Sequence, residues 1–253
     1  MKYLLKSEKS TTFAAKFMKP NHFEHKFAKE LIQWLPVVRF DGEVIIVDEL
    51  SKVRDSIDYL SRQKYIGVDT ESRPSFVRGI RYQTALLQMA TEERCYLFRL
   101  SAIGLPQEVA DLFSNPNICK IGLAFKDDLN GLRRRCNFKP TNCVDLQSIA
   151  GKYGILDLGL QKMFAICFGK KISKSQQLTN WENALLTPEQ ARYASTDAWA
   201  TLLIYKELMS TEPLPPAEAE ALKRAELERQ YQHQQEVLAA RQNTNEQNAT
   251  PHA

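Results

Sequence analysis

One short apolar run constrains the fold more than any other part of this sequence. Tyr65–Val68 is long enough only for a strand, and it ends directly in Asp69-Thr70-Glu71. Because side chains alternate along a strand, Asp69 and Glu71 point to one face and their carboxylates converge. Burying two carboxylates together is costly unless a cation neutralises them. The run therefore predicts a buried strand with an acidic tip, whereas a solvated turn is the ordinary explanation of an isolated Asp-x-Glu.

Short apolar runs alternate with helical segments along most of the chain, which indicates an α/β fold. Strand-like runs fall at 44–47, 65–68, 85–89, 96–100, 118–122 and 142–144. A polar turn at 91–94 joins the third and fourth of these runs, whereas helical segments separate the later ones. Strands joined by a tight turn are antiparallel, and strands joined through a helix are usually parallel. The pattern predicts a mixed, partly antiparallel sheet flanked by helices.

The last long helix of this region has a complete start signal. Thr187 is a suitable N-cap, Pro188 fits the first helical position, and Gln190 stands three residues after the cap. Within this helix Tyr193 and Asp197 are four residues apart and share a face that also carries alanines, so this face is expected to contact the sheet. An inward-facing aspartate needs a partner, which could be a cation or simply an arginine.

A third acidic position is the pair Asp127-Asp128, which opens the helix predicted at 127–136. Capping and the helix dipole are sufficient to explain an acid at a helix start. Taken together with the acids of the strand and of the last helix, the pair adds to a set of oxygen ligands of the kind that Mg²⁺ and Mn²⁺ favour.

Histidine and cysteine usage excludes several other chemistries. The histidines, which are His22, His25, His233 and His252, lie outside the region of alternating strands and helices, so a Ser–His–Asp or Cys–His mechanism has no core histidine. The 5 cysteines are odd in number and lack CxxC spacing, which argues against a disulfide framework and a cysteine zinc site. No apolar run approaches a membrane span and no secretory signal is evident, so we expect a cytoplasmic protein without a membrane partner. A net charge of +4 is compatible with a polyanionic partner.

In their order along the chain, the acidic motifs resemble the DEDDy group of 3′→5′ exonucleases, and most of all ribonuclease D and the exonuclease domain of the Werner syndrome protein. Asp69-x-Glu71 is followed by Asp128-Leu129-x-x-Leu132 and then by Tyr193-x-x-x-Asp197. Further similar stretches are Arg73–Phe76, Ala85–Gln88, Asp145-Leu146 and Leu178–Trp181. The resemblance covers roughly Phe40 to Met209, which is most of the chain.

The resemblance implies a ribonuclease H-like fold with a mixed five-stranded sheet flanked by helices. It also implies a metal-dependent exonuclease that removes nucleoside monophosphates from a nucleic acid with a free 3′ end, using two divalent cations, Mg²⁺ or Mn²⁺. The metal-binding acids of the family fall on Asp69, Glu71, Asp128 and Asp197, and its tyrosine falls on Tyr193. Asp128 is chosen over Asp127 because the family pattern places leucine directly after the acid.

Basic and aromatic residues near these motifs are candidate substrate contacts. Arg73 follows the first motif and Lys174 lies in the basic loop before the last helix, so either could bind a phosphate. Phe76 could stack on the terminal base. The plain alternatives are solvated surface cations for Arg73 and Lys174 and a core aromatic for Phe76.

We expect three segments: a basic N-terminal extension at 1–39, an exonuclease domain at 40–210, and a Pro-linked tail at 211–253 that is helical to about 241 and then disordered. The tail is too short for the helical nucleic-acid-binding domain that ribonuclease D proteins carry after the nuclease, so DNA is slightly favoured as the substrate. An RNA 3′-end trimming exoribonuclease is the alternative enzyme. A non-catalytic nucleic-acid-binding module with the same fold is the alternative from another class.

Overall fold

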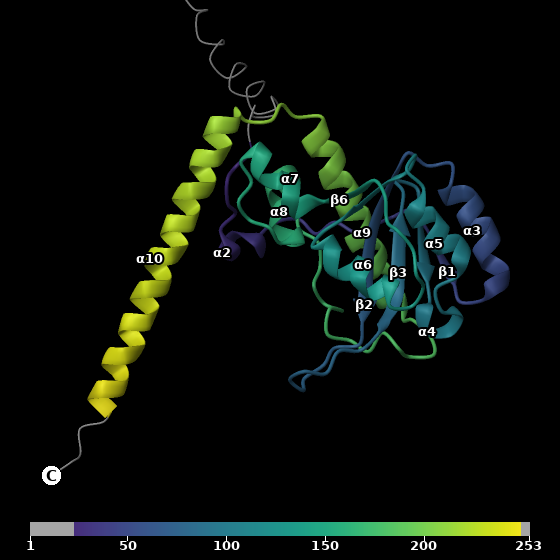
Figure 1. Cartoon of the computed structure of the whole chain (residues 1–253), viewed down its shortest axis with the longest axis horizontal. Coiled ribbons are helices and arrows are strands. Elements are labelled where there is room, and N and C mark those ends of the chain that lie inside the picture. Colours follow the sequence, from purple (N-terminus) through teal and green to yellow (C-terminus); the bar gives the residue numbers. More distant parts are fainter. Residues whose placement is uncertain (1–22, 249–253) are drawn as a thin grey trace, which may run out of the picture.

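The computed structural model describes residues 23–248 of the chain, and its centre is a six-stranded sheet with the order β1-β4-β3-β2-β5-β6 (Figure 1). The strands are β1 Glu43–Val47, β2 Tyr65–Ser72, β3 Thr84–Ala90, β4 Arg94–Phe98, β5 Cys119–Gly122 and β6 Cys143–Asp145. β3 runs antiparallel to both β2 and β4, and the remaining pairs are parallel. The predicted mixed sheet is confirmed. The expected count of five strands is wrong, because β6 adds a short parallel strand at the edge beside β5.

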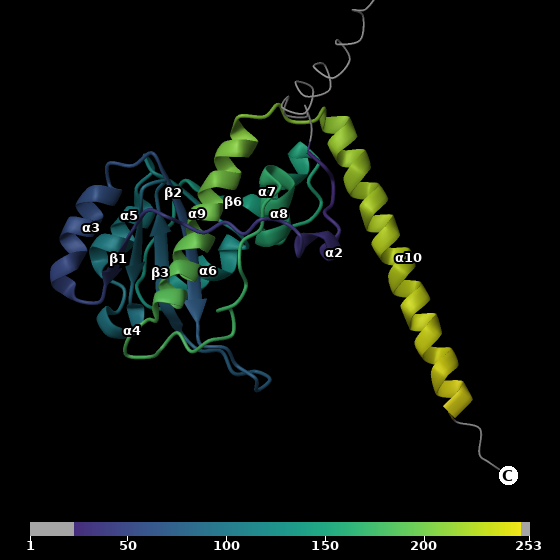
Figure 2. The same ribbon diagram turned by 180° about the vertical axis from the view of Figure 1, so that it is seen from behind.

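Helices cover both faces of the sheet, as Figures 1 and 2 show from opposite sides. The helices that precede the last strand are α2 Lys29–Ile32, α3 Val53–Leu60, α4 Leu100–Ile103, α5 Gln107–Ser114 and α6 Phe125–Arg133. Those that follow it are α7 Leu146–Ala150, α8 Leu160–Phe168, α9 Pro188–Met209 and α10 Pro216–Asn248, with two 3₁₀ turns, η1 Leu50–Lys52 and η2 Gly151–Tyr153. None of the helices in the described part of the chain combines the length and apolar character of a membrane span.

The two faces of the sheet have separate apolar cores. On one face α3 and α5 pack on side chains such as Val68, Leu87 and Met89. On the other face α9 packs on Leu86 and Ala90, which alternate with them along β3. This alternation is the period of a strand, so the fully apolar β3 has both of its faces covered. α7 and α8 extend the core beside α9.

α9 begins where the sequence predicted. The Thr187 hydroxyl accepts a hydrogen bond from the Gln190 amide at 3.1 Å, and the Gln190 side chain accepts one from the Thr187 amide at 3.0 Å. The helix then crosses β2 so closely that a Cβ placed on Gly67 would lie 2.0 Å from the Ala198 carbonyl oxygen. A glycine in the strand and alanine in the helix therefore permit contact between the two backbones.

β2 is longer than the apolar run that predicted it. The acids were expected at the tip of the strand, and pairing with β3 includes them and continues to Ser72, with Asp69 opposite Gln88 and Glu71 opposite Leu86. The ladder continues because backbone pairing does not depend on side-chain polarity and β3 supplies a partner for each residue. The acids thus lie inside a regular strand, and a bulge between Glu71 and Ser72 ends the regular register.

Within the described residues, the segment before β1 contacts both the loop that precedes α9 and the helix α10. The Val38 amide donates to the Lys171 carbonyl oxygen at 2.8 Å, and the Lys171 amide donates to that of Pro36 at 3.0 Å. Lys26 forms an ion pair with Glu226 of α10 at 2.6 Å. α10 continues to Asn248, beyond the end predicted near 241, and projects away from the sheet (Figure 1). His22 and His252 lie outside the described residues.

Candidate active site

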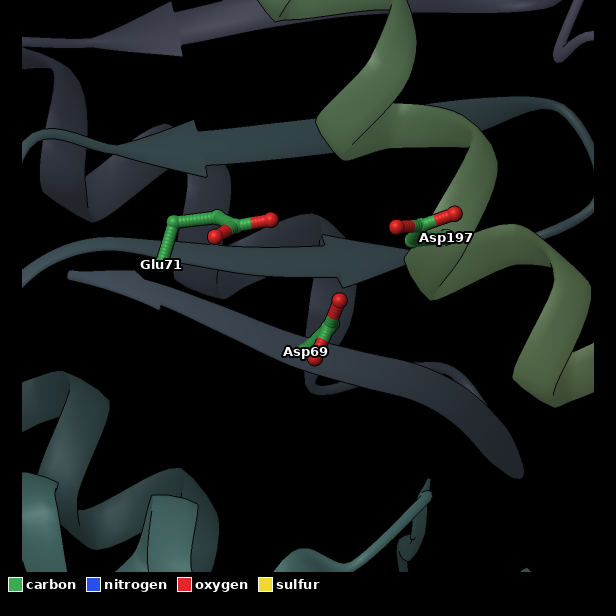
Figure 3. A group of neighbouring side chains, drawn as sticks. All are labelled: Asp69, Glu71 and Asp197. Atoms are coloured by element: carbon green, nitrogen blue, oxygen red, sulfur yellow. The ribbon is translucent and has the colours of Figure 1, made fainter. Parts of the chain in front are cut away.

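Three carboxylates from two distant parts of the sequence meet above the middle of the sheet. Asp69 and Glu71 come from β2 and Asp197 comes from α9, and one carboxylate oxygen of each lies within 4.8 Å of the other two (Figure 3). Asp69 and Glu71 share a face of β2, as their spacing predicted, and it is the face that α9 covers. The close approach of α9 to Gly67 brings Asp197 within reach of both.

Asp128 lies near Asp69, Glu71 and Asp197 but is not one of the three carboxylates that meet within 4.8 Å. It is on the first turn of α6, and its carboxylate accepts a hydrogen bond of 2.5 Å from the Thr70 hydroxyl. Thr70 alternates with Asp69 and Glu71, so it points to the opposite face of β2. Asp127, its neighbour, is exposed. Of the two adjacent aspartates, only Asp128 therefore faces β2.

The four acids are in an environment that opposes their ionisation. Burial first, and then repulsion by Asp128, Glu71 and Asp197, raises the pKa of Asp69 well above its usual range. Burial and the repulsion of Asp197 and Asp128 raise the pKa of Glu71 to about 9. Burial is also the main reason why the pKa of Asp128 and that of Asp197 rise to about 7.

Nothing among the described side chains neutralises these charges directly. No lysine or arginine of residues 23–239 forms an ion pair with any of the four acids. Oxygen ligands at close quarters without a basic partner match the preference of hard divalent cations. The residues present thus fit a divalent cation: they supply an all-carboxylate ligand set, and a bound cation would remove the repulsion between them.

Tyr193 is buried one turn before Asp197 on α9 and is hydrogen-bonded to it. Burial, followed by the charges of Asp197 and Glu71, raises the pKa of its phenol above the ordinary value. Its ring packs on Trp181 with 6.0 Å between ring centroids. The phenol therefore stays protonated at neutral pH and can donate a hydrogen bond, whereas it is a poor proton acceptor.

The three predicted substrate contacts differ in how far their side chains are already engaged by other residues of the protein. Arg73 is engaged by Glu182 at 3.7 Å and lies over the ring of Tyr82, 4.8 Å from its centroid. Phe76 is 85% exposed in the loop between β2 and β3, so the alternative of a core aromatic is wrong. Lys174 is exposed before α9, and its charge acts to lower the pKa of Asp197.

Sequence reasoning missed two residues of this region. Thr70 holds Asp128, and its only signal was its place between the two acids of the strand. Gln88 lies directly opposite Asp69, is 0% exposed, and neither its amide oxygen nor its amide nitrogen has a hydrogen-bond partner among the described residues. A polar residue within the apolar run 85–89 was the signal, since buried amides are normally paired. The amide of Gln88 is thus free to form a hydrogen bond with a group that binds beside Asp69.

Comparisons with known proteins agree with this geometry. Residues 44–211 match the profile of a family described as 3'-5' exonuclease. The mouse bifunctional 3'-5' exonuclease/ATP-dependent helicase WRN is 32% identical over 184 residues, and the human exonuclease mut-7 homolog is 25% identical over 234 residues. These matches cover 69% and 80% of this chain, but only 13% and 25% of those two proteins.

Solved structures show the same fold. The EXO domain of Nibbler from Aedes aegypti superposes with a TM-score of 0.61 at 25% identity, over 71% of this chain and 95% of that one. Escherichia coli RNase D superposes with a TM-score of 0.60 at 23% identity, over 73% of this chain and 49% of that one. These likenesses confirm the ribonuclease H-like fold expected from the sequence.

Proposed function

The chain belongs to the 3'-5' exonuclease family, and on that premise we propose that it removes nucleoside monophosphates from the 3′ end of a nucleic acid with the help of two divalent cations. The single observation that carries the proposal is the convergence of Asp69, Glu71 and Asp197 within 4.8 Å, next to the buried hydroxyl of Tyr193. A non-catalytic binding module would not need to keep buried, mutually repelling acids, since such groups destabilise the fold.

Asp69, Glu71, Asp128 and Asp197 would hold the cations. Mg²⁺ or Mn²⁺ bound by these acids supplies Lewis acidity for an in-line displacement at phosphorus and neutralises the charge of the transition state. Asp69 would be shared by the whole ligand set, because Asp128, Glu71 and Asp197 all lie close enough to repel its carboxylate. Thr70 fixes the orientation of the Asp128 carboxylate through its hydrogen bond.

Tyr193 would position a reacting group rather than accept its proton. Its phenol remains protonated because burial and the neighbouring acids oppose its ionisation. The hydrogen bond to Asp197 holds the hydroxyl at the edge of the acid group, and the ring cannot swing away because Trp181 packs against it. A hydroxyl held in this way can orient the attacking water or a phosphate oxygen before the displacement.

Both DNA and RNA are candidate substrates, since they present the same phosphodiester to the same acids. RNA 3′-end trimming is the second candidate function, because E. coli RNase D, which shares the fold, is an exoribonuclease. A direct comparison of DNA and RNA oligonucleotides of the same sequence decides between the two.

The test uses the purified full chain and 5′-labelled DNA and RNA oligonucleotides with Mg²⁺ or Mn²⁺. We expect a ladder that shortens from the 3′ end, complete loss of cleavage in EDTA, and protection by a blocked 3′ end. Asp128→Asn should abolish turnover, whereas Asp127→Asn should retain most of it, because an exposed helix-start charge is worth at most about 1 kcal/mol. Undiminished cleavage in EDTA, or internal cleavage of the blocked substrate, would overturn the proposal.

A further inference from the structure

Next to the acids, α9 borders a groove made of two cavities. The first, of about 110 Å³, is lined by Tyr193, Arg192 and Arg39 together with the hydroxyl-bearing loop residues Ser173 and Ser175. The second, of about 460 Å³, is also lined by Arg39 and Arg192. Because the cavities share these residues, they are neighbours, and we call them together the α9 groove. The groove begins at Tyr193 and therefore at the edge of the candidate active site.

The walls of the α9 groove are tied together by hydrogen bonds. The segment at 36–40 is held on one side by the bond from the Val38 amide to the Lys171 carbonyl oxygen at 2.8 Å. On the other side the Phe40 amide donates to the Thr196 hydroxyl on α9 at 3.1 Å. Arg39 lies between these two anchors. Its backbone is thus fixed against α9 in the free protein, and the groove is preformed.

Both arginines of the groove have guanidinium groups that are available to a ligand. Arg39 and Arg192 are exposed, and neither side chain forms a hydrogen bond or an ion pair with any other described residue. Two acids also line the groove: Glu189 faces the first cavity and Asp41 the second. The groove as a whole therefore carries two guanidinium groups and two carboxylates, and both guanidinium groups border both cavities. Arg73, by contrast, already forms an ion pair with Glu182.

A polyanionic strand needs such cations here. A strand whose 3′ nucleotide lies at the acids must run past one of the walls of the site, and its further phosphates need cationic partners there. The wall at Tyr193 opens into a groove with two unpaired arginines, each of which can bind a phosphate through two parallel hydrogen bonds. Contacts of this kind position a strand without reading its sequence.

We propose that the α9 groove binds the sugar-phosphate backbone on the 5′ side of the scissile bond, with Arg39 and Arg192 on successive phosphates. This inference rests on the proposed exonuclease function and adds a second binding site to it. The ligand is a single strand with at least two phosphates beyond the terminal one. Ser173 and Ser175, which are hydrogen-bonded to each other at 3.0 Å, offer further polar contacts in the first cavity.

The test compares Arg39→Ala/Arg192→Ala with Arg54→Ala/Arg62→Ala in the full chain. Arg54 lies on α3 and Arg62 just after it, on the opposite side of the sheet, so the control removes the same charge. KM and kcat are measured with Mg²⁺ for a dinucleotide and for a 12-nucleotide strand over a range of salt concentrations. For the longer strand we expect the groove variant to raise KM at least tenfold and to reduce the salt slope by about 1.4, or 0.7 for each lost phosphate contact.

Further readouts make each outcome decisive. Arg39→Lys/Arg192→Lys keeps both charges and should restore most of the salt slope, which a folding defect would not allow. If the groove variant and the α3 control give the same KM and salt slope on the 12-nucleotide strand, the α9 groove is not a backbone site. If the wild-type protein cleaves neither substrate, the proposed function itself fails, and this result is distinct from a failure of the groove.

Discussion

The two longest helices of the protein, α9 and α10, differ in what they do for the fold. α9 has 22 residues, of which 12 are buried, and it presents Tyr193 and Asp197 to the sheet. α10 has 33 residues and projects away from the sheet (Figure 1), and of its side chains at 216–239 only Ala219 and Glu226 are buried. Length therefore does not make a helix part of a core. A helix gains most of its stability from a face that packs against other elements.

Composition explains the difference. The inner face of α9 carries alanines that let the helix lie against β2 and β3. α10 is rich in Glu, Gln and Arg, and large apolar residues in its described part stand in solvent: Leu227 is 71% exposed and Tyr231 is 64% exposed. A helix that is polar all round has no continuous stripe to bury. Small substitutions in α9 are therefore expected to change the activity or the stability of the protein. Removal of the distal half of α10 is expected to change neither.

The largest effect is expected on the inner face of α9. Tyr193→Phe removes one hydroxyl that is held by Asp197 and keeps the ring packed on Trp181. A lost orienting or acid–base contact typically lowers the rate about 10²–10⁴-fold. Single-turnover rates should show this loss while the melting temperature and the metal titration change little. Near wild-type cleavage would mean that Tyr193 only fills the interface.

A smaller but structural effect should follow from Gly67→Ala on β2. The added Cβ would lie 2.0 Å from the Ala198 carbonyl oxygen, so α9 would have to move away from the strand. Overpacking of this kind costs about 1–3 kcal/mol. Gly159→Ala is the matched control, since its Cβ would meet nothing within 4 Å, and less than about 1 kcal/mol is expected there. Equal denaturant midpoints for the two variants would show that α9 and β2 are less tightly packed.

The start of α9 provides a finer test. Thr187→Ala removes the hydroxyl that accepts a hydrogen bond from the Gln190 amide at 3.1 Å. Loss of such a cap costs about 1 kcal/mol of stability. Thr187→Ser, which retains the hydroxyl, should recover most of it in the same denaturant titration. If Ala and Ser give the same stability, the cap contributes nothing to a helix that is already held by the sheet.

The smallest effect is expected in α10. A chain that stops after His233 keeps Ala219 and the ion pair between Lys26 and Glu226, so its stability should stay within about 0.5 kcal/mol of the full chain. A chain that stops before Pro216 loses both contacts and should melt at a lower temperature. Equal losses for the two truncations would mean that the distal half of α10 packs in solution, and the contrast between the two helices would fail.

Much of the fold could be predicted because its signals are local. The N-cap of α9, the apolar period of β3 and the alternation that puts Asp69 and Glu71 on one face depend on residues within a few positions of each other. The strand order was not accessible in this way. β1 lies beside β4 rather than β2, because contacts between distant segments select the neighbours of a strand.

The sequence by itself determined which residues carry acidic and phenolic groups, and on which side of each strand or helix they stand. Only the tertiary structure decided that Asp197 meets Asp69 and Glu71 within 4.8 Å, that β2 pairs with β3 as far as Ser72, and that Arg39 and Arg192 line one groove. The physical reason is the distance along the chain over which each interaction acts. Capping and backbone periodicity act within one or two turns, whereas the meeting of residues more than a hundred positions apart depends on how whole elements pack.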